Sequence, residues 1–337
     1  METQLLAPDE EGIVAAAAVI RRQGIVAFPT ETVYGLGADA MVARAVARVF
    51  AAKERPRFDP VIVHVASPED VGTLWTEVPP LARRLMETFW PGPLTLVLPR
   101  RRRVPAIVTA GLPTVAVRMP DHPVALALIR AAGRPIAAPS ANRFGRLSPT
   151  HHDDVLSQLA GQVDAVIAGG PTPVGIESTV VSLAEEVPVV LRPGGTPLEA
   201  LREVIPELRT APPLGPSASP GTLPRHYLPA TPLFLLDHGP VPERSEQVDR
   251  LACGFLAFRE EWSGFGRVEV LSPGGDLVEA GARFFSTLHR LDRAGLAAII
   301  AEPIREEGLG VAMMDRLRRA AAGRAYLGEG QVWMARN

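Results

Sequence analysis

The stretch GIVAFPTETVYGLGADA, residues 24–40, decides the fold class and contains the first group of polar residues. Its first part, GIVAFPT, is a short apolar run that ends near Pro29, which is typical of a buried strand. From Thr30 onwards, the stretch brings two threonines, a glutamate, a tyrosine and two glycines at the end of that strand. Glycines let a backbone approach a ligand closely, and hydroxyls supply short-range donors. We therefore expect a ligand-binding segment here.

Gly35-Leu-Gly37-Ala-Asp-Ala40 also matches the G-x-G-x-x-A dinucleotide fingerprint. That fingerprint opens directly at the end of its strand. Here Gly35 comes six positions after Pro29. The spacing therefore argues against a dinucleotide-binding turn.

Outward from this stretch, apolar strand-like and helix-like segments alternate. Helices are expected at residues 9–22, with Asp9 as N-cap, and at 41–52, 81–89 and 123–132. Strands are expected at VIVHV, LTLVLP, TVAVRMP, PIAAPSAN, DAVIAGG, STVVSL and PVVLRPGG. The pattern predicts an α/β domain over residues 1–209, built on a twisted mixed sheet.

A change in composition follows this domain. Residues 210–232 contain seven prolines and no apolar period, which predicts a linker or lid. Its Arg225-His226-Tyr227 segment is unusual for a plain spacer and suggests function. Residues 233–337 predict a smaller, Rossmann-like α/β domain, with strands at LFLLD, CGFLAF, RVEVLS and 296–302 and helices at 280–291 and 310–322.

Composition excludes several classes of protein. The 337 residues carry a net charge of −2, which argues against a chain that mainly coats nucleic acid. The single cysteine, Cys253, excludes an internal disulfide and a cysteine-based zinc site, as expected in a reducing cytoplasm. The amino-terminal residues do not resemble a signal peptide. No apolar run approaches the ~20 residues that cross a bilayer. We expect a cytoplasmic protein without a membrane segment.

The basic residues are almost all arginine. Of 35 lysines and arginines, only Lys53 is a lysine. It begins Lys53-Glu-Arg55-Pro-Arg57-Phe-Asp59, in which three cations lie within five residues. Such a cluster fits a polyphosphate, because lysine acts on phosphate as a compact point charge. Helix C-terminal charges complementing the macrodipole are the plainer explanation. No P-loop motif is present.

Two further polar groups follow predicted strands. The first is Ser140-Ala-Asn142-Arg-Phe-Gly-Arg-Leu-Ser148-Pro-Thr150, at a strand end where open α/β sheets bind ligands. The same segment is also consistent with a polar turn in which Thr150 is the N-cap of the next helix. The second is GIESTV, residues 175–180, followed by LRPGG. Ser178 lacks the G-x-S-x-G context of a hydrolase nucleophile.

The histidines and the remaining arginines are weaker candidates. His64, inside VIVHV, is as consistent with a core residue as with a ligand-binding residue. His151-His152-Asp153-Asp154 suggests a metal, but adjacent histidines point to different faces of a helix, so we expect no metal site. The run from Arg100 to Arg103 predicts a solvated loop, with a phosphate or RNA contact left open.

These groups contain no convincing catalytic triad, metal cluster or redox motif. Hydroxyls, glycines and cations at strand ends instead suit the binding of a nucleoside triphosphate and a small carboxylate, which react through positioning and charge neutralisation.

Together the motifs PTETVYGLG, K-x-R-P, SAN…SPT, GIESTV, LRPG, SPG…RHY and GLGVAMMDRL (308–317) resemble the YrdC-type threonylcarbamoyl-AMP synthases in their long, two-domain form. The resemblance implies a nucleotidyltransferase that makes L-threonylcarbamoyl-AMP and pyrophosphate from L-threonine, bicarbonate and ATP, with Mg²⁺ accompanying the nucleotide. The product would pass to the tRNA threonylcarbamoyl transferase machinery, which modifies the adenosine next to the anticodon.

The resemblance also implies roles for individual residues. Lys53, Arg55 and Arg118 would be the catalytic cations. Threonine would be held by Thr32, His64, Arg118, the Ala138 backbone and Ser178. ATP would be held by Lys53, Arg55, Asp59, Thr114, Ser140, Asn142, Ser148 and Arg192, with Tyr227 closing over the nucleotide. The family usually has asparagine where this chain has Asp59, which adds a negative charge near the phosphates unless an arginine or metal compensates.

Two alternatives remain. An RNA-binding translation or ribosome-assembly factor would use the basic loop at residues 100–103. A carbamoyl-adenylate-forming enzyme, as in the hydrogenase-maturation carbamoyltransferases, would normally carry zinc-finger cysteines, which this chain lacks. The sequence does not reveal the oligomeric state or the task of the C-terminal domain.

Overall fold

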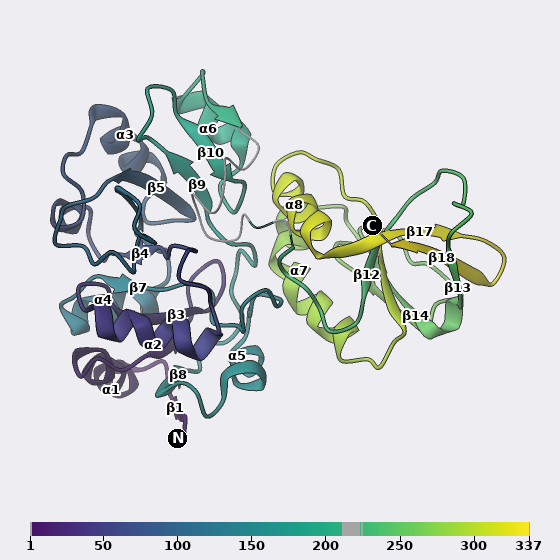
Figure 1. Ribbon diagram of the computed structural model, residues 1–337, viewed down its shortest axis with the longest axis horizontal. Helices are drawn as coiled ribbons and strands as arrows, with labels where there is room; N and C mark the ends of the chain where they lie inside the picture. Colours follow the sequence, from purple (N-terminus) through teal and green to yellow (C-terminus); the bar gives the residue numbers. More distant parts are fainter. Residues whose placement is uncertain (1, 211–222, 224, 337) are drawn as a thin grey trace. The chain divides into compact units, whose positions relative to one another are not determined.

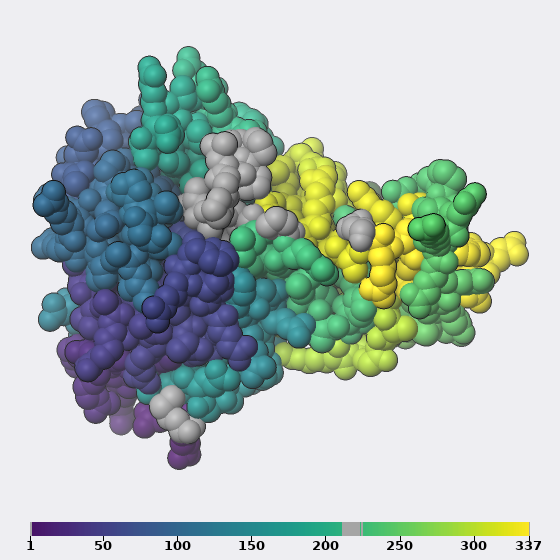
Figure 2. Space-filling model, viewed as in Figure 1, coloured from purple at the N-terminus to yellow at the C-terminus, as the bar shows by residue number. Residues whose placement is uncertain are grey.

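The chain forms two compact units (Figure 1). The computed structural model describes residues 2–210, 223 and 225–336. The first unit comprises Met1–Phe144 and Ser148–Leu223, and the second comprises Gly145–Leu147 and Pro224–Asn337. In the space-filling view, most of the surface of the first unit runs from purple to teal and that of the second from green to yellow (Figure 2).

The predicted linker at residues 210–232 is described only in part. Residues 211–222 and 224 lie outside the described residues. The segment after them packs within the second unit, where the backbone N–H groups of Ala230 and Thr231 donate to the carboxylate of Asp292 at 3.0 and 2.7 Å. Ala230 and Thr231, within the predicted linker, thus bond to a residue of the second unit.

The first unit alternates strands and helices along the chain. Its elements are β1 (Gln4–Leu6), α1 (Glu10–Arg21), β2 (Val26–Phe28), β3 (Gly35–Asp39), α2 (Ala43–Lys53), β4 (Val63–His64), the 3₁₀ helix η1 (Pro68–Thr73), α3 (Pro80–Phe89), β5 (Leu94–Pro99), β6 (Thr114–Arg118), α4 (Pro123–Ala132), β7 (Ile136–Ala137), α5 (His152–Leu159), β8 (Ala165–Ile167), β9 (Thr179–Ser182), β10 (Val189–Arg192), α6 (Leu198–Val204) and β11 (Arg209–Thr210). Asp9 caps α1 as predicted, because its side chain accepts from the Gly12 N–H at 2.9 Å.

The strands of the first unit join in one mixed sheet of order β1-β8-β2-β3-β7-β4-β6-β5-β9-β10-β11. Helices cover both faces of this sheet. Successive residues of a strand point to opposite faces, so neighbouring residues of β2 pack against different helices. Val26 and Phe28 pack with α1 and α4, whereas Ile25 and Ala27 pack with α2 and α5. The α/β class with a mixed sheet is therefore confirmed.

The segment GLGAD forms strand β3, not a turn ahead of a helix. It pairs antiparallel with β2 and β7. A Cβ at Gly37 would lie 2.6 Å from Ile136 Cγ2 and 2.7 Å from Phe28 Cε1. The absence of a side chain at Gly37 therefore lets Ile136 and Phe28 approach the strand closely.

The second unit is built on a separate mixed sheet of order β13-β18-β17-β12-β16-β14-β15. Its elements are β12 (Leu233–Leu236), β13 (Glu246–Asp249), η2 (Arg250–Ala252), β14 (Cys253–Ala257), β15 (Arg267–Val270), α7 (Leu277–Asp292), β16 (Ala298–Ala301), α8 (Gly310–Ala320), β17 (Ala321–Leu327) and β18 (Gln331–Arg336). Strands β13, β17 and β18 were not anticipated. None of the described helices is both long and apolar enough to cross a bilayer.

The core of the first unit gives a stability prediction. Phe28 is fully buried in the core beside α1 and α4. Phe28→Ala should lower the free energy of unfolding by about 3–5 kcal/mol, since it removes buried apolar surface and leaves a cavity. Denaturant unfolding of the purified variant measures the change. Phe58, which is 54% exposed, is the matched control. Phe58→Ala should change stability by less than about 0.5 kcal/mol, and equal effects would contradict the assigned core.

Candidate functional site

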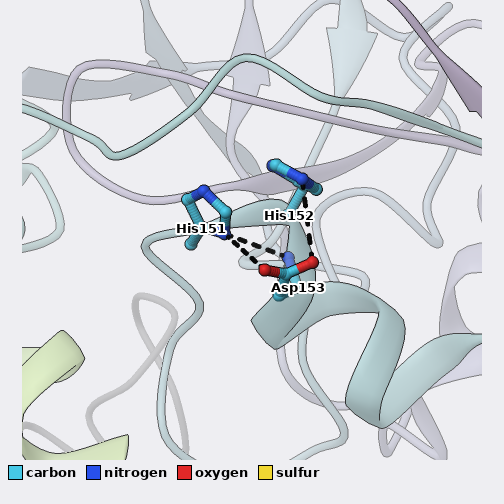
Figure 3. A group of neighbouring side chains, drawn as sticks. All are labelled: His151, His152 and Asp153. Atoms are coloured by element: carbon cyan, nitrogen blue, oxygen red, sulfur yellow. Dashed lines mark hydrogen bonds and ion pairs between the residues drawn. The ribbon is translucent and has the colours of Figure 1, made fainter.

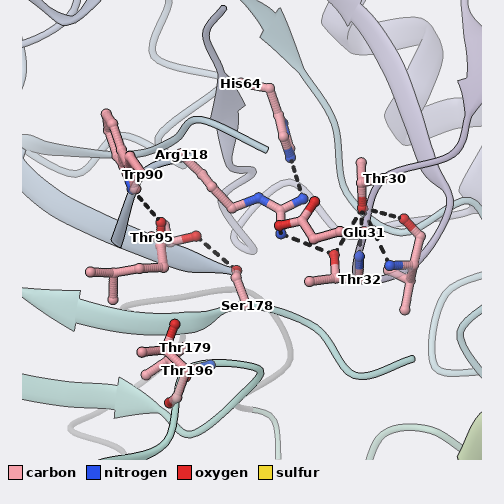
Figure 4. Close-up of polar contacts among 12 residues, drawn as sticks. Thr30, Glu31, Thr32, His64, Trp90, Thr95, Arg118, Ser178, Thr179 and Thr196 are labelled. Carbon is pink, nitrogen blue, oxygen red and sulfur yellow. Dashed lines mark hydrogen bonds and ion pairs between the residues drawn. The ribbon is translucent and has the colours of Figure 1, made fainter. Parts of the chain in front are cut away.

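A group of buried polar side chains gathers where several elements of the first unit end (Figure 4). His64 ends β4 and Arg118 ends β6, and the two residues are register partners across the parallel pair. The segment after β2 brings Thr30, Glu31 and Thr32 against them. Residues from distant parts of the sequence thus meet because the mixed strand order places β4 beside β6.

Arg118 is the centre of this group. Its Nη1 donates to Thr32 Oγ1 at 2.9 Å and lies 3.3 Å from Glu31 Oε1, and its Nη2 lies 3.3 Å from His64 Nε2. Its Nε is buried and makes no hydrogen bond to any described residue. Burial lowers the pKa of Arg118, and the Glu31 carboxylate partly opposes that shift. A buried guanidinium with an unused donor suits a carboxylate ligand.

The neighbours of Arg118 also have altered proton affinity. Burial lowers the pKa of His64 well below its usual range, and the Arg118 charge lowers it further, so the imidazole is neutral. Burial raises the pKa of Glu31, while the adjacent Arg118 partly opposes the rise. The site therefore contains a cation, a carboxylate and a neutral imidazole in direct contact.

Ser178 lies in a second set of hydroxyls immediately before β9. Its Oγ lies 2.7 Å from Thr95 Oγ1, and Arg192 Nη2 donates to the Ser178 carbonyl oxygen at 2.8 Å. The LRPGG segment packs closely here, since a Cβ at Gly194 would lie 2.2 Å from the Glu177 carbonyl oxygen. Hydrogen bonds to both the side chain and the backbone of Ser178 thus fix its position.

Lys53 ends α2 and is 1% exposed. Its Nζ donates to the carbonyl oxygens of Ser140 and Asn142 at 2.6 and 2.5 Å. The helix closes with Glu54 in the left-handed region and with Arg55 N–H bonded to the Phe50 carbonyl oxygen, the pattern of a Schellman cap. Burial lowers the pKa of Lys53 well below its usual range, and nearby Arg55 adds to the effect. The only lysine of the chain therefore fastens the loop that carries Ser140 and Asn142.

Arg55 compensates the charge of Asp59. Its Nη2 lies 2.9 Å from Asp59 Oδ2, and both side chains are almost fully buried. The same guanidinium donates to the carbonyl oxygens of Asp59 and Pro60 at 3.1 and 2.7 Å. The negative charge of Asp59, which asparagine at this position would lack, is thus paired with an arginine in the same loop.

The remaining predicted residues are distributed as follows. Ser148 Oγ donates to Glu177 Oε1 at 2.5 Å, and the Ala138 N–H donates to the Ile62 carbonyl oxygen at 2.9 Å. Thr114 begins β6 and Arg118 ends it, so about 13 Å of extended strand separates them. Among the described residues, no hydrogen bond or ion pair joins the Thr114 side chain to the Arg118 group.

Tyr227 lies in the second unit and is buried. Its ring centroid lies 5.8 Å from that of Phe285 and 4.2 Å from that of His226, and the Arg316 guanidinium lies 5.3 Å above it. Its φ of 62° is unusual for a residue with a side chain. The Tyr227 ring therefore packs against side chains of the second unit.

Two sequence interpretations around α5 need correction. His151, not Thr150, is the N-cap, with a 3.4 Å contact from the Asp153 N–H to its Nδ1. Because His151 lies before the helix and His152 within it, their rings do not diverge but lie 4.0 Å apart between centroids (Figure 3). Ligand atoms of His151, His152 and Asp153 lie within 4.8 Å of one another. A helix N-terminus disfavours a cation, so the cluster alone does not identify a metal site.

The basic loop at residues 100–103 makes contacts within the chain. Arg101 Nε donates to the Gly72 carbonyl oxygen at 2.7 Å, and Arg103 Nε donates to that of Thr73 at 2.7 Å. Arg100 donates to the carbonyl oxygens of residues 104 and 112. These bonds attach the loop to η1 and give three of its arginines a structural role.

Comparison with known proteins identifies the family. The Sua5/YciO/YrdC family model, described as telomere recombination, matches residues 18–194. The model described as threonylcarbamoyl-AMP synthase, C-terminal domain, matches residues 196–322. The threonylcarbamoyl-AMP synthase of Pyrococcus abyssi is 44% identical over 326 residues, covering 93% of this chain and 95% of its own. The chain belongs to the threonylcarbamoyl-AMP synthase family.

Other members of the threonylcarbamoyl-AMP synthase family agree. That of Bacillus subtilis is 42% identical over 335 residues and covers 96% of both chains. The crystal structure of P. abyssi Sua5 complexed with L-threonine has a TM-score of 0.87 and 39% identity, covering 97% of this chain and 100% of that one. Family, fold and the nucleotidyltransferase class expected from the motifs are confirmed.

Three polar residues of the site were not expected from the sequence. Glu31 contacts Arg118, Thr95 contacts Ser178, and Glu177 contacts Ser148. Glu31 and Glu177 stand inside motifs quoted for other residues. Thr95 is the one polar residue of the apolar run LTLVLP, which is the signal that would have identified it.

Lys53 gives a prediction for this family member. Lys53→Arg keeps the charge but places a larger, planar group in a fully enclosed position. We expect the free energy of unfolding to fall by about 1–3 kcal/mol and ATP-dependent turnover to fall with it. Arg48→Lys, on the same helix at a partly exposed ion pair with Asp164, is the matched control and should behave as wild type. Unchanged turnover in Lys53→Arg would show that the lysine is not required.

Proposed function

We propose that this chain synthesises L-threonylcarbamoyl-AMP from L-threonine, bicarbonate and ATP and releases pyrophosphate. The product would serve the threonylcarbamoylation of the tRNA adenosine next to the anticodon. The main support is the full-length similarity to threonylcarbamoyl-AMP synthases, one of which is solved with L-threonine. We also propose that the reaction takes place in the cytoplasm and that the product passes to the tRNA threonylcarbamoyl transferase machinery.

Threonine would bind in the Arg118 group. Arg118 offers a buried, unused Nε for the carboxylate of the amino acid. Thr32 and Ser178 supply hydroxyls, His64 is neutral, and the Ala138 backbone lies beside β4. This arrangement supports the assignment of Thr32, His64, Arg118, Ala138 and Ser178 to threonine.

ATP would bind along the neighbouring loops. Lys53, Arg55 and Arg192 are the buried cations, and the hydroxyl and amide groups come from Thr114, Ser140, Asn142 and Ser148. Lys53 holds the loop with Ser140 and Asn142 in place, and Arg55 neutralises Asp59. The domain boundaries at residues 209–210 and 232–233 and the closure of Tyr227 over the nucleotide belong to the same proposal.

The chemistry follows from charge and position. The amine of threonine forms a carbamate with bicarbonate, and a carbamate oxygen then attacks the α-phosphorus in line as pyrophosphate leaves. Buried cations offset the charge on the phosphates. Mg²⁺ would accompany the nucleotide and neutralise phosphate charge. It is bound chiefly by phosphates, water and one or two carboxylates. The carboxylate of Glu177, beside Ser148, fits that donor set.

The RNA-binding alternative is less well supported. Arg101 and Arg103 donate to backbone carbonyls of the chain itself. We keep a weak RNA contact as a part of the proposal, tested by the salt dependence of binding to duplex RNA.

The activity itself is directly testable. Purified protein should release pyrophosphate from ATP only when both L-threonine and bicarbonate are present. The acyl-adenylate product should be detected by mass spectrometry in the same reaction. Alanine in place of threonine is the control for the amino acid. Absence of threonine-dependent pyrophosphate release would contradict the proposed function.

Tyr227→Ala tests the contribution of the segment before β12. We expect turnover to fall while the unfolding transition of the first unit is unchanged, since the ring packs within the second unit. Tyr326→Ala removes another buried tyrosine from that unit and is the matched control. If both variants lose turnover equally, the effect is destabilisation of the second unit and not the loss of a nucleotide contact.

A further inference from the structure

Glu31 is a buried carboxylate without an assigned role. It is 3% exposed, and its Oε1 lies 3.3 Å from Arg118 Nη1. Its second oxygen, Oε2, is buried and accepts no hydrogen bond from any described residue. An ionised carboxylate can only accept hydrogen bonds, and burial of an acceptor without a partner is unfavourable. The geometry therefore leaves Oε2 available to a donor from outside the chain.

The unused donor of Arg118 indicates which ligand this is. Arg118 Nε and Glu31 Oε2 are both buried and both lack a partner among the described residues. The two side chains carry opposite charges, and they already form an ion pair through Arg118 Nη1 and Glu31 Oε1. One site therefore offers a cationic donor and an anionic acceptor at adjacent positions. An α-amino acid carries the complementary pair, a carboxylate and an ammonium group.

We propose that Glu31 is a catalytic base, which receives the α-ammonium group of the amino acid substrate on Oε2 and takes its proton as the carbamate forms. The inference rests on the proposed function and adds a residue to it. Arg118 would bind the carboxylate of the same substrate, so that the two side chains orient the amine for reaction.

The proton balance requires such a base. In R–NH₃⁺ + HCO₃⁻ → R–NH–COO⁻ + H₂O + H⁺, the nitrogen lone pair forms the N–C bond and the C–OH bond breaks. The hydroxyl leaves as water with one ammonium proton, and one further proton must be removed. Glu31 accepts that proton. The carbamate then attacks the α-phosphorus, and Glu31 returns its proton to solvent after product release.

The surroundings of Glu31 support this role. Burial raises the pKa of its carboxyl and nearby Asp121 adds to the rise, while Arg118 and backbone N–H groups of residues 31 and 121 oppose it. His64, on the other side of Arg118, is neutral. A carboxylate whose pKa is raised towards the operating pH is a more effective proton acceptor than an exposed one. It is active in its ionised form, so activity is lost as the pH falls.

A purely structural role makes different predictions. If Glu31 only orients Arg118, its loss should weaken threonine binding and impair the forward and reverse reactions equally. A base acts only where the amine loses its proton. The reverse reaction, in which threonylcarbamoyl-AMP and pyrophosphate form ATP and carbamate, does not include that step.

Glu31→Gln keeps the size of the side chain and removes the base. We expect the forward kcat, measured as threonine-dependent pyrophosphate release at fixed bicarbonate, to fall about 10²–10⁴-fold. Initial ATP formation from threonylcarbamoyl-AMP and pyrophosphate should stay within about tenfold of wild type, and the acidic limb of the forward pH profile should disappear. Asp164→Asn removes a carboxylate bound to Arg48 in the same unit and should leave both rates unchanged.

Three outcomes would overturn the proposal. The first is a forward rate of Glu31→Gln within about threefold of wild type, and the second is an equal loss in both directions, which indicates a positioning role. The third applies to wild type, and so does not depend on the variant folding: forward and reverse rates that fall equally on acidification. Wild-type protein without threonine-dependent turnover would instead contradict the proposed function itself.

Discussion

The buried guanidinium of Arg118 is the interaction on which the arrangement of the first unit depends. A charge removed from water must be surrounded by acceptors and an opposite charge. Here β4 supplies His64, and the segment after β2 supplies Glu31 and Thr32, around the Arg118 that ends β6. These elements are distant in sequence, so the sheet order and the polar site are specified together. A change of strand register at β4 or β6 would break both.

Much of this architecture could be predicted from local sequence. Alternation of apolar runs with amphipathic segments correctly gave the α/β class, and Asp9 identified the start of α1. Strand β3 was missed, because its glycines resemble a turn unless the close approach of Ile136 and Phe28 is known. Strands β17 and β18 were also missed, since the boundary with α8 lies within an alanine-rich run.

The candidate site was predictable to a different degree. Motifs identified the segments, but they did not identify which atoms meet. The Arg55–Asp59 pair depends on how the loop turns after the left-handed Glu54. The close approach of the His151 and His152 rings depends on one residue lying before the helix and one within it. Glu31 emerged only from its three-dimensional contact with Arg118, because the motif that contains it does not depend on its carboxylate.

The burial of Lys53 has a practical consequence for the study of this protein. It is the only lysine in the chain and is 1% exposed, with its amine held between two carbonyl oxygens. The folded chain therefore presents no accessible side-chain amine to acylating reagents or amine-reactive cross-linkers. Modification of Lys53 would report opening of the first unit, and partner proteins are better captured through carboxylates or a cysteine introduced on the surface.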